Sequence, residues 1–259
     1  MNIVVCVKYV PDAQADRSFT ADNTTDRASV DGLLSELDEY AVEEALVIAD
    51  ANDGEVTVLT MGPDDAATAI KKSLQMGAHK GVHILDDAIA GSDSVATSLI
   101  LSSAIRKIGD VDLVLTGLGS TDGGMSVVPA MLAERLGLPQ VTFASEVTVA
   151  DGSVTIRRDG DAAAETIKAS LPAVVSVTDQ INEPRYPSFK GIMAAKKKPV
   201  DTWSLADIEV EASQVGLDAA WSTVVNVEQR PPRSQGTIVT DEGNGGAELA
   251  DYLAAGKFI

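Results

Sequence analysis

The sequence predicts an α/β protein with a mostly parallel, doubly wound sheet, an antiparallel hairpin insertion and an extended C-terminal arm. Three observations support this. Apolar β-rich runs recur along the chain, segments with helical spacing lie between them, and both patterns fade near residue 199. Of the 259 residues, 45% are hydrophobic and 23% are charged, which is the ordinary balance of a folded globular protein.

Five runs are apolar and rich in β-branched residues, and we expect each to form a strand. They lie at residues 3–7, 56–60, 82–85, 111–116 and 173–178. Most are too continuous for a strand with one face in water. Such runs are typical of a parallel sheet that is covered on both faces.

Three segments between these strands repeat apolar residues on one helical face. They lie at 37–48, 67–74 and 101–108. Strands that alternate with helices predict βαβ units, whose right-handed crossovers place helices on both faces of the sheet. Ligands of such sheets bind in the crevice at the carboxyl ends of the strands.

The pattern changes after residue 139, where apolar and polar residues alternate. Asp-Gly pairs at 151–152 and 159–160 supply turn signals, so this region predicts an antiparallel meander or hairpin pair. The run at 173–178 then returns to the core.

Few core positions follow Pro199, apart from a short helix expected at about 246–255. A tail with so little core of its own is better explained as an arm laid on another surface than as a separate domain. We therefore expect an α/β domain over 1–198 and an arm over 199–259.

Charge and cysteine content exclude several classes of function. With 20 Lys and Arg against 39 Asp and Glu, the formal charge is −19, which repels the phosphate backbone of nucleic acid. The same acidity fits either a salty habitat or plain solubility. Cys6 is the single cysteine, so an internal disulfide and a cysteine-rich metal centre are excluded, and a reducing cytosol is expected. No run approaches the roughly 18 apolar residues that span a bilayer.

The most informative segment is 111–137, in which a strand leads through a Gly, Ser and Thr loop into a helix. Glycines let main-chain N–H groups approach an anion, and hydroxyls near a helix start add donors. The glycines of this loop are Gly117, Gly119, Gly123 and Gly124, and its hydroxyl residues are Ser120, Thr121 and Ser126. The loop predicts a phosphate cradle, and the alternative is a tight connection without ligand. It matches neither the P-loop nor the dinucleotide fingerprint.

Residues that carry catalysis are scarce. His79 and His83 lie near glycines at a turn that enters a strand, so no metal site is expected there. Adjacent Glu43 and Glu44 predict a solvated helix edge. Cys6, inside a strand, predicts a small apolar role rather than a nucleophile. We expect no catalytic residue.

A second distinctive segment spans 180–201. After a turn stiffened by two prolines, Phe189, Ile192 and Met193 stand beside lysines on an acidic chain. This pattern predicts a docking surface. The alternative puts the three apolar residues in the core and Lys196 to Lys198 in solvent.

Several of these stretches, taken together, resemble the β subunit of electron transfer flavoprotein, including FixA-like members. They are VCVKYVPD at 5–12, AVEEAL at 41–46, the loop segment 111–137, LPQVTFAS at 138–145, LPAVVSV at 171–177, NEPRYPSFKGIMAAKKK at 182–198 and PPRSQG at 231–236. The similarity runs from the first strand to the C-terminal arm.

The resemblance implies a cytoplasmic electron carrier with a sheet of the adenine nucleotide alpha hydrolase-like type. It implies a heterodimer of α and β subunits, with FAD held mainly by α and a structural AMP in β. The complex would carry electrons from acyl-CoA and related dehydrogenases, as in fatty acid β-oxidation, to a membrane quinone oxidoreductase. The β subunit would do no bond chemistry of its own, and its arm would pack on α.

The resemblance also assigns contacts position by position. For AMP it implies Cys6, Ser35, Glu36, Leu37, Asp38, Met61, Gly117, Leu118, Gly119, Ser120, Thr121, Asp122, Gly123, Gly124, Met125, Ser126, Val127 and Val128. For dehydrogenase docking it implies Tyr186, Phe189, Ile192 and Met193, with Phe189 as the anchor where many relatives have leucine.

Two departures from the family affect the nucleotide. Many relatives have Asn-Pro where this chain has Ser35 and Glu36, and polar side chains where it has residues 122–128. Main-chain N–H groups of 120–126 would then bind more of the phosphate, and Glu36 would have to point away. A bifurcating member, with a second FAD in place of AMP, and a freestanding nucleotide-binding or nucleotide-cleaving protein are the alternatives.

Overall fold

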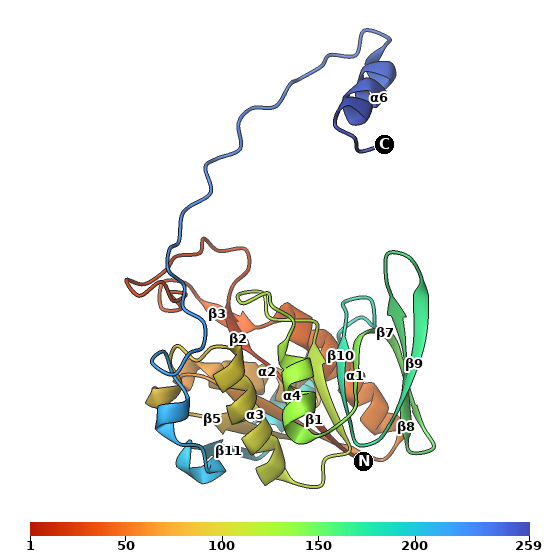
Figure 1. Cartoon of the computed structure of the whole chain (residues 1–259). Coiled ribbons are helices and arrows are strands. Elements are labelled where there is room, and N and C mark those ends of the chain that lie inside the picture. The colour runs from red at the N-terminus through yellow and green to blue at the C-terminus, as the bar shows by residue number, and fades with distance from the viewer. The chain divides into compact units, whose positions relative to one another are not determined.

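The computed structural model describes all 259 residues, which form two compact units, Met1–Val225 and Asn226–Ile259. The first unit is built on a large sheet (Figure 1). This sheet has nine strands in the order β11-β5-β4-β1-β6-β10-β7-β8-β9. Its strands are β1 (Asn2–Cys6), β4 (Glu55–Met61), β5 (Lys80–Ile84), β6 (Leu113–Gly117), β7 (Gln140–Ala150), β8 (Ser153–Asp159), β9 (Ala164–Ser170), β10 (Ala173–Val177) and β11 (Val200–Trp203).

The sheet is parallel from β11 to β7, which confirms the predicted fold class. The strands β7, β8 and β9 then pair antiparallel, as the turn signals predict, and extend the same sheet. A small second sheet joins β2 (Tyr9–Pro11) to β3 (Gly32–Leu34), two strands too short to give a sequence signal.

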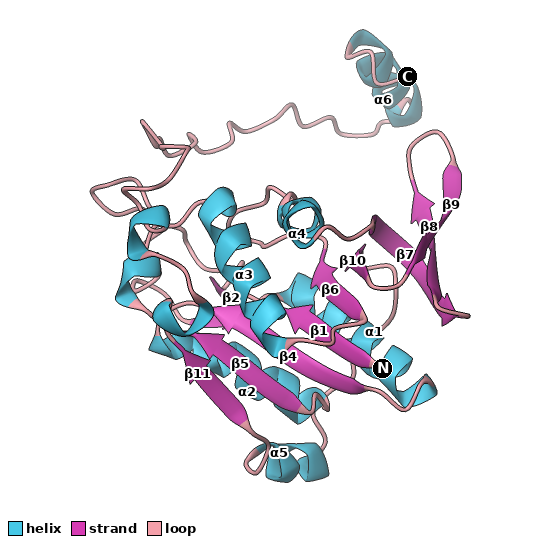
Figure 2. Ribbon diagram, turned by 60° about the horizontal axis from the view of Figure 1, so that its bottom comes forward, coloured by secondary structure: helices cyan, strands magenta, loops and turns pink.

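Helices cover both faces of the sheet (Figure 2). The helices are α1 (Glu36–Ala51), α2 (Ala67–Met76), α3 (Ser94–Ile108), α4 (Val128–Leu136), α5 (Phe189–Ala195) and, in the second unit, α6 (Gly245–Ala255). Alternate residues of β1 point to opposite faces. Val5 packs in the core with α1 and α2, and Val4 packs in the other core with α3 and α4.

The structure moves the boundary of the C-terminal arm. The sequence pattern predicts that the chain leaves the domain at Pro199, but β11 pairs with β5 at the edge of the sheet, and Leu205, Ile208 and Val215 are buried in the same core as α3. These residues lie in short turns without helical or alternating spacing, so the sequence pattern gives no signal for them. The second unit, 226–259, contains α6, in which no residue is buried.

No helix in the structure combines the length and the hydropathy that crossing a membrane requires.

Candidate nucleotide site and docking segment

The residues expected to contact nucleotide lie at one edge of the sheet. Cys6 ends β1, Met61 ends β4 and Gly117 ends β6. These three strands are adjacent and parallel, so their carboxyl ends meet. The cradle, which we define as residues 117–128, leaves from this edge and leads into α4.

The start of α1 closes against the cradle at Gly117. A Cβ built on Gly117 would stand 2.6 Å from the main-chain oxygen of Leu37 and 2.6 Å from Oδ1 of Asp38. Only glycine lets the strand end pass so close to the helix. The residues 35–38 and the cradle are therefore brought together, as the crevice rule predicts.

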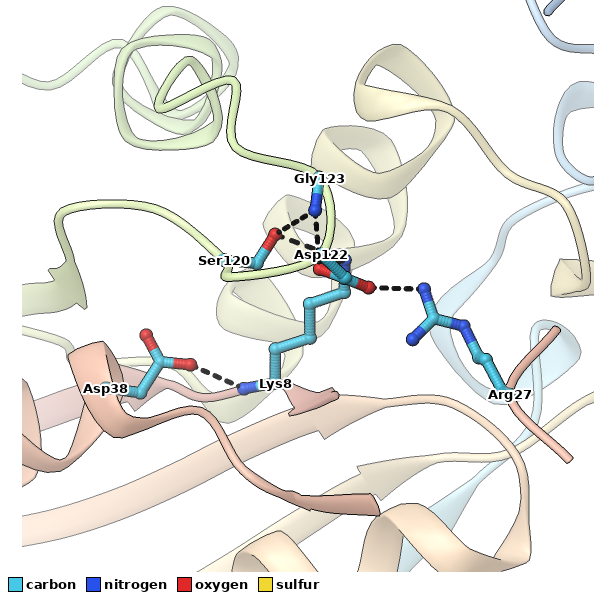
Figure 3. A network of polar contacts seen from close by, with 6 residues as sticks. All are labelled: Lys8, Arg27, Asp38, Ser120, Asp122 and Gly123. Carbon is cyan, nitrogen blue, oxygen red and sulfur yellow. Dashed lines mark hydrogen bonds and ion pairs between the residues drawn. The ribbon is translucent and has the colours of Figure 1, made fainter. Parts of the chain in front are cut away.

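An ion-pair network around the buried carboxylate of Asp122 ties the cradle to two other segments (Figure 3). Asp122, whose side chain is 1% exposed, receives Lys8 Nζ on Oδ1 at 2.8 Å and Arg27 Nη2 on Oδ2 at 2.5 Å. Lys8 Nζ also donates to Ser120 Oγ at 3.3 Å. Burial alone would raise the pKa of Asp122, but the two cations outweigh it and hold that pKa well below its usual range.

Neither Lys8 nor Arg27 was among the predicted contacts. Lys8 follows β1 by two residues, so the rule that ligands bind at the carboxyl ends of the strands could have placed it at the crevice. Arg27 lies in the 12–31 connection, which has no periodic pattern to show where it folds.

Two hydroxyl groups of the expected contact set are buried without a partner. Only three buried side-chain polar atoms lack a hydrogen bond, and Ser35 Oγ and Thr121 Oγ1 are two of them. Buried polar atoms are nearly always paired, so two orphans at one site indicate a ligand that supplies the missing bonds. The donor set at this edge, hydroxyl, amide and cation, fits a phosphorylated nucleotide.

Part of the main-chain donor set is used inside the cradle itself. Gly123 N–H donates to Asp122 Oδ1 at 2.7 Å, and Gly124 N–H donates to the main-chain oxygen of Ser120 at 2.9 Å. Fewer main-chain N–H groups of residues 120–126 are therefore free to bind phosphate than the residue types suggest. Glu36, whose negative charge would repel a nucleotide phosphate, is exposed.

Asp38 and Cys6 meet at the base of the site. Asp38 Oδ2 accepts the main-chain N–H of Lys8 at 2.8 Å. Burial raises the pKa of Asp38 to about 7. Burial, assisted by the charge of Asp38, raises the pKa of Cys6 to about 12, so its thiol stays protonated, in keeping with the predicted apolar role.

Replacing Asp38 by asparagine should flatten the pH dependence of stability. The native pKa of about 7 exceeds the ordinary 3.8, so between these values the native chain holds a proton that the unfolded chain has lost. The free energy of unfolding therefore falls as pH rises from about 4 to about 7, by a few kcal/mol at most. Urea unfolding of both proteins between pH 5 and 8 measures the effect. We expect Asp38→Asn to gain stability relative to the parent as pH rises, and parallel curves would refute this role.

The side chains of both histidines form hydrogen bonds with main-chain atoms. His79 Nδ1 accepts the main-chain N–H of Val56 at 3.0 Å, and buried His83 has Nε2 3.1 Å from the carbonyl oxygen of Gly62. The structure contains no cluster of three or more His, Cys, Asp or Glu side chains suited to a metal ion.

The prediction that Glu43 and Glu44 form a solvated helix edge is wrong. Each residue is only 7% exposed. Glu43 Oε2 accepts Arg185 Nε at 2.8 Å and its main-chain N–H at 3.0 Å, and Asn182 Nδ2 donates to Glu44 at 3.1 Å. Their partners are 138 to 142 residues away in sequence, so local spacing does not show them.

These bonds fix one end of the docking segment, which we define as residues 182–198. Lys198 fixes the other end, since its Nζ donates to the carbonyl oxygens of Leu74 and Gly77 at 3.0 Å each, at the C-terminus of α2. The alternative that left Lys198 in solvent is therefore wrong. The segment is therefore held to α1 at one end and to α2 at the other.

The apolar side chains of the docking segment point to solvent rather than into the core. Tyr186 is 92% exposed, Phe189 81%, Met193 48% and Ile192 36%. Exposed aromatic groups of this size on one short segment are typical of an interaction site.

Comparisons with known proteins agree with these features. A family model described as electron transfer flavoprotein domain matches residues 22–208. The chain is 49% identical over 264 aligned residues to the electron transfer flavoprotein subunit beta of Mycobacterium tuberculosis, an alignment that covers 100% of this chain and 99% of that protein. It is 35% identical to the caffeyl-CoA reductase-Etf complex subunit CarD of Acetobacterium woodii, over 93% of this chain and 92% of that one. It is 34% identical to the protein FixA of Azorhizobium caulinodans, over 93% and 89%.

Proposed function

This chain belongs to the electron transfer flavoprotein family as a β subunit, and we propose that it binds AMP structurally and docks dehydrogenases for its α subunit. The family is one of electron carriers that contain a flavin. In our proposal FAD is held mainly by α and shared with β, and electrons pass from acyl-CoA and related dehydrogenases to a membrane quinone oxidoreductase. We place the complex in the cytoplasm, where the buried thiol of Cys6 stays reduced.

The observation that carries the AMP proposal is the pair of orphaned hydroxyls at the crevice. Ser35 Oγ and Thr121 Oγ1 are buried without partners, on the two segments that Gly117 brings together. A nucleotide bound here supplies hydroxyl or phosphate groups to both. In this proposal the nucleotide is a structural component, and the β subunit itself makes and breaks no bonds.

The docking proposal is supported by the surface chemistry of the segment. The chain carries −19, yet Lys190 directly follows Phe189 in α5, and Lys196 and Lys197 directly follow the end of that helix. A groove of about 270 Å³ between α2 and α5, lined by Lys71, Gln75, Ile192, Ala195 and Lys196, adds apolar contact next to positive charge. This surface complements a partner with an apolar pocket and an acidic rim.

Phe189→Ala tests the docking role. Truncation of a hot-spot aromatic commonly costs about 2 kcal/mol or more, so we expect at least about a 30-fold weaker apparent affinity for an acyl-CoA dehydrogenase. The measurement is flavin reduction in the α/β complex as dehydrogenase concentration is varied. Trp221→Ala, which removes an aromatic side chain that is 86% exposed on another segment, serves as control.

Nucleotide content and heterodimer yield should be unchanged in Phe189→Ala, because the side chain lies outside the core. Loss of either would show that Phe189 supports the fold, and equal affinities for the two variants would remove Phe189 as the anchor.

A bifurcating complex is the second candidate, since a subunit named for a caffeyl-CoA reductase-Etf complex is 35% identical to this chain. In that case a second FAD would take the place of AMP. Counting FAD per heterodimer separates the two.

A further inference from the structure

The Asp122 carboxylate is an internal anion in the cradle, held between two cations from separate parts of the chain. Lys8 lies between β1 and β2 and binds Oδ1, and Arg27 comes from the 12–31 connection and binds Oδ2. Two positive charges and one negative charge give these three side chains a net charge of +1. Burial raises the pKa of the neighbouring Asp38 to about 7, so its carboxyl cancels only part of that charge near neutral pH.

Both cations keep part of their surface free for a further partner. The side chain of Lys8 is 42% exposed and that of Arg27 is 38% exposed, whereas that of Asp122 is only 1% exposed. An anion can therefore approach the cations without displacing the carboxylate. Thr121, which precedes Asp122 in sequence, has a buried hydroxyl without a hydrogen-bond partner. This hydroxyl independently indicates that the cradle binds a ligand.

The connection that carries Arg27 is braced by its own polar contacts. Asp22 accepts hydrogen bonds from Thr20 and Thr24, and Phe19 bridges to Thr25. Asn23 Nδ2 also donates to the carbonyl oxygen of Val224 at 3.0 Å. The guanidinium is thus aimed at the cradle by a formed loop.

We propose that Lys8 and Arg27 are the cationic ligands of the phosphate group in this cradle, and that Asp122 is the positioning residue that holds both cations in place. The ligand class is a nucleoside phosphate whose phosphate group lies beside the exposed parts of the two cations. This inference rests on the proposed nucleotide site and adds the residues that recognise its charge.

The test uses the α/β complex after its nucleotide has been removed and compares AMP with adenosine, which lacks the phosphate. Binding of each is measured by calorimetry at low and high salt. The variants are Arg27→Gln and Lys8→Met, and the matched control is Arg17→Gln, which removes the same charge from an exposed position on the same connection.

We expect Arg27→Gln and Lys8→Met each to weaken AMP binding about tenfold, while adenosine binding stays within about twofold of the parent. The salt dependence of AMP binding should fall in both variants, because each has lost a charge that salt screens. Arg17→Gln should match the parent for both ligands. If Lys8→Met fails to fold, Arg27→Gln decides alone.

Equal AMP affinity for Arg27→Gln and Arg17→Gln would overturn this inference while leaving the nucleotide site intact. A proportional loss of AMP and adenosine binding would show that the cations only support the fold, and would overturn it too. A parent complex that binds neither ligand would overturn the proposed nucleotide site itself.

Discussion

Removal of residues 226–259 should abolish formation of the α/β complex. In this unit Leu249 is 59% exposed, Tyr252 67%, Phe258 71% and Ile259 78%, and no residue of α6 is buried. A helix with such an apolar surface has no core of its own to bury it, so we propose that this unit packs on the α subunit. Because a few large apolar residues dominate most interfaces, we expect the affinity to fall at least about 100-fold.

Co-purification of tagged α with full-length and truncated chains measures this loss. The truncated chain should keep its thermal unfolding temperature, because both hydrophobic cores lie within 1–225. A finer pair of variants keeps the full length: Leu249→Ser with Tyr252→Ser should weaken the complex, whereas Glu248→Ser with Asp251→Ser on the same helix should not. Undiminished binding by the truncated chain would place the α contact in the first unit.

Gly117→Ala should empty the nucleotide site and destabilise the first unit. The added Cβ would stand 2.6 Å from the carbonyl oxygen of Leu37, which is backbone and is fixed at the start of α1. Overpacking of this kind typically costs about 1–3 kcal/mol, and the forced shift separates the cradle from residues 35–38.

Thermal unfolding and released nucleotide are measured together in this variant. Gly160→Ala is the control, because its Cβ would stand 3.4 Å from its nearest neighbour in the hairpin turn, which is ordinary contact. We expect a lower unfolding temperature and less nucleotide for Gly117→Ala alone. Full nucleotide content with a parent-like unfolding temperature would show that the close approach is not needed.

Local patterns were enough to predict the sheet and its helices. Continuous apolar runs mark β1, β4, β6 and β10, and period-2 alternation with Asp-Gly turns marks the hairpin strands. Both signals come from neighbours within one element. The edge strand β11 has four residues, three of them exposed, and its packing depends on β5 more than 100 residues earlier, so no local pattern marks it.

Part of the site could be predicted from the sequence. The glycines of 117–128 and the helix that follows indicate a phosphate cradle, and the structure brings the expected segments to one edge. The charge network could not be predicted from local patterns, because Arg27 and its partner Asp122 are 95 residues apart in the sequence. Glu43 shows the same limit: a carboxylate on a helix resembles a solvated residue until its distant partner, Arg185, is placed.

Hydrogen bonds to residues that are far away in the sequence hold the docking segment in place. Phe189 is the kind of residue that folding normally buries, and burial of its side chain would be favourable. It stays 81% exposed because Asn182 and Arg185 fasten one flank to α1 and Lys198 fastens the other to α2. A surface fixed in this way loses little conformational entropy when a partner binds.

The nucleotide content of the α/β complex is the most direct test of the account. The chain is co-expressed with its α partner, the purified complex is precipitated with acid, and the released nucleotides are identified by chromatography and mass. We expect one FAD and one AMP per heterodimer. Two FAD would indicate a bifurcating complex, and a complex that releases FAD but no second nucleotide would contradict the nucleotide site proposed at the cradle.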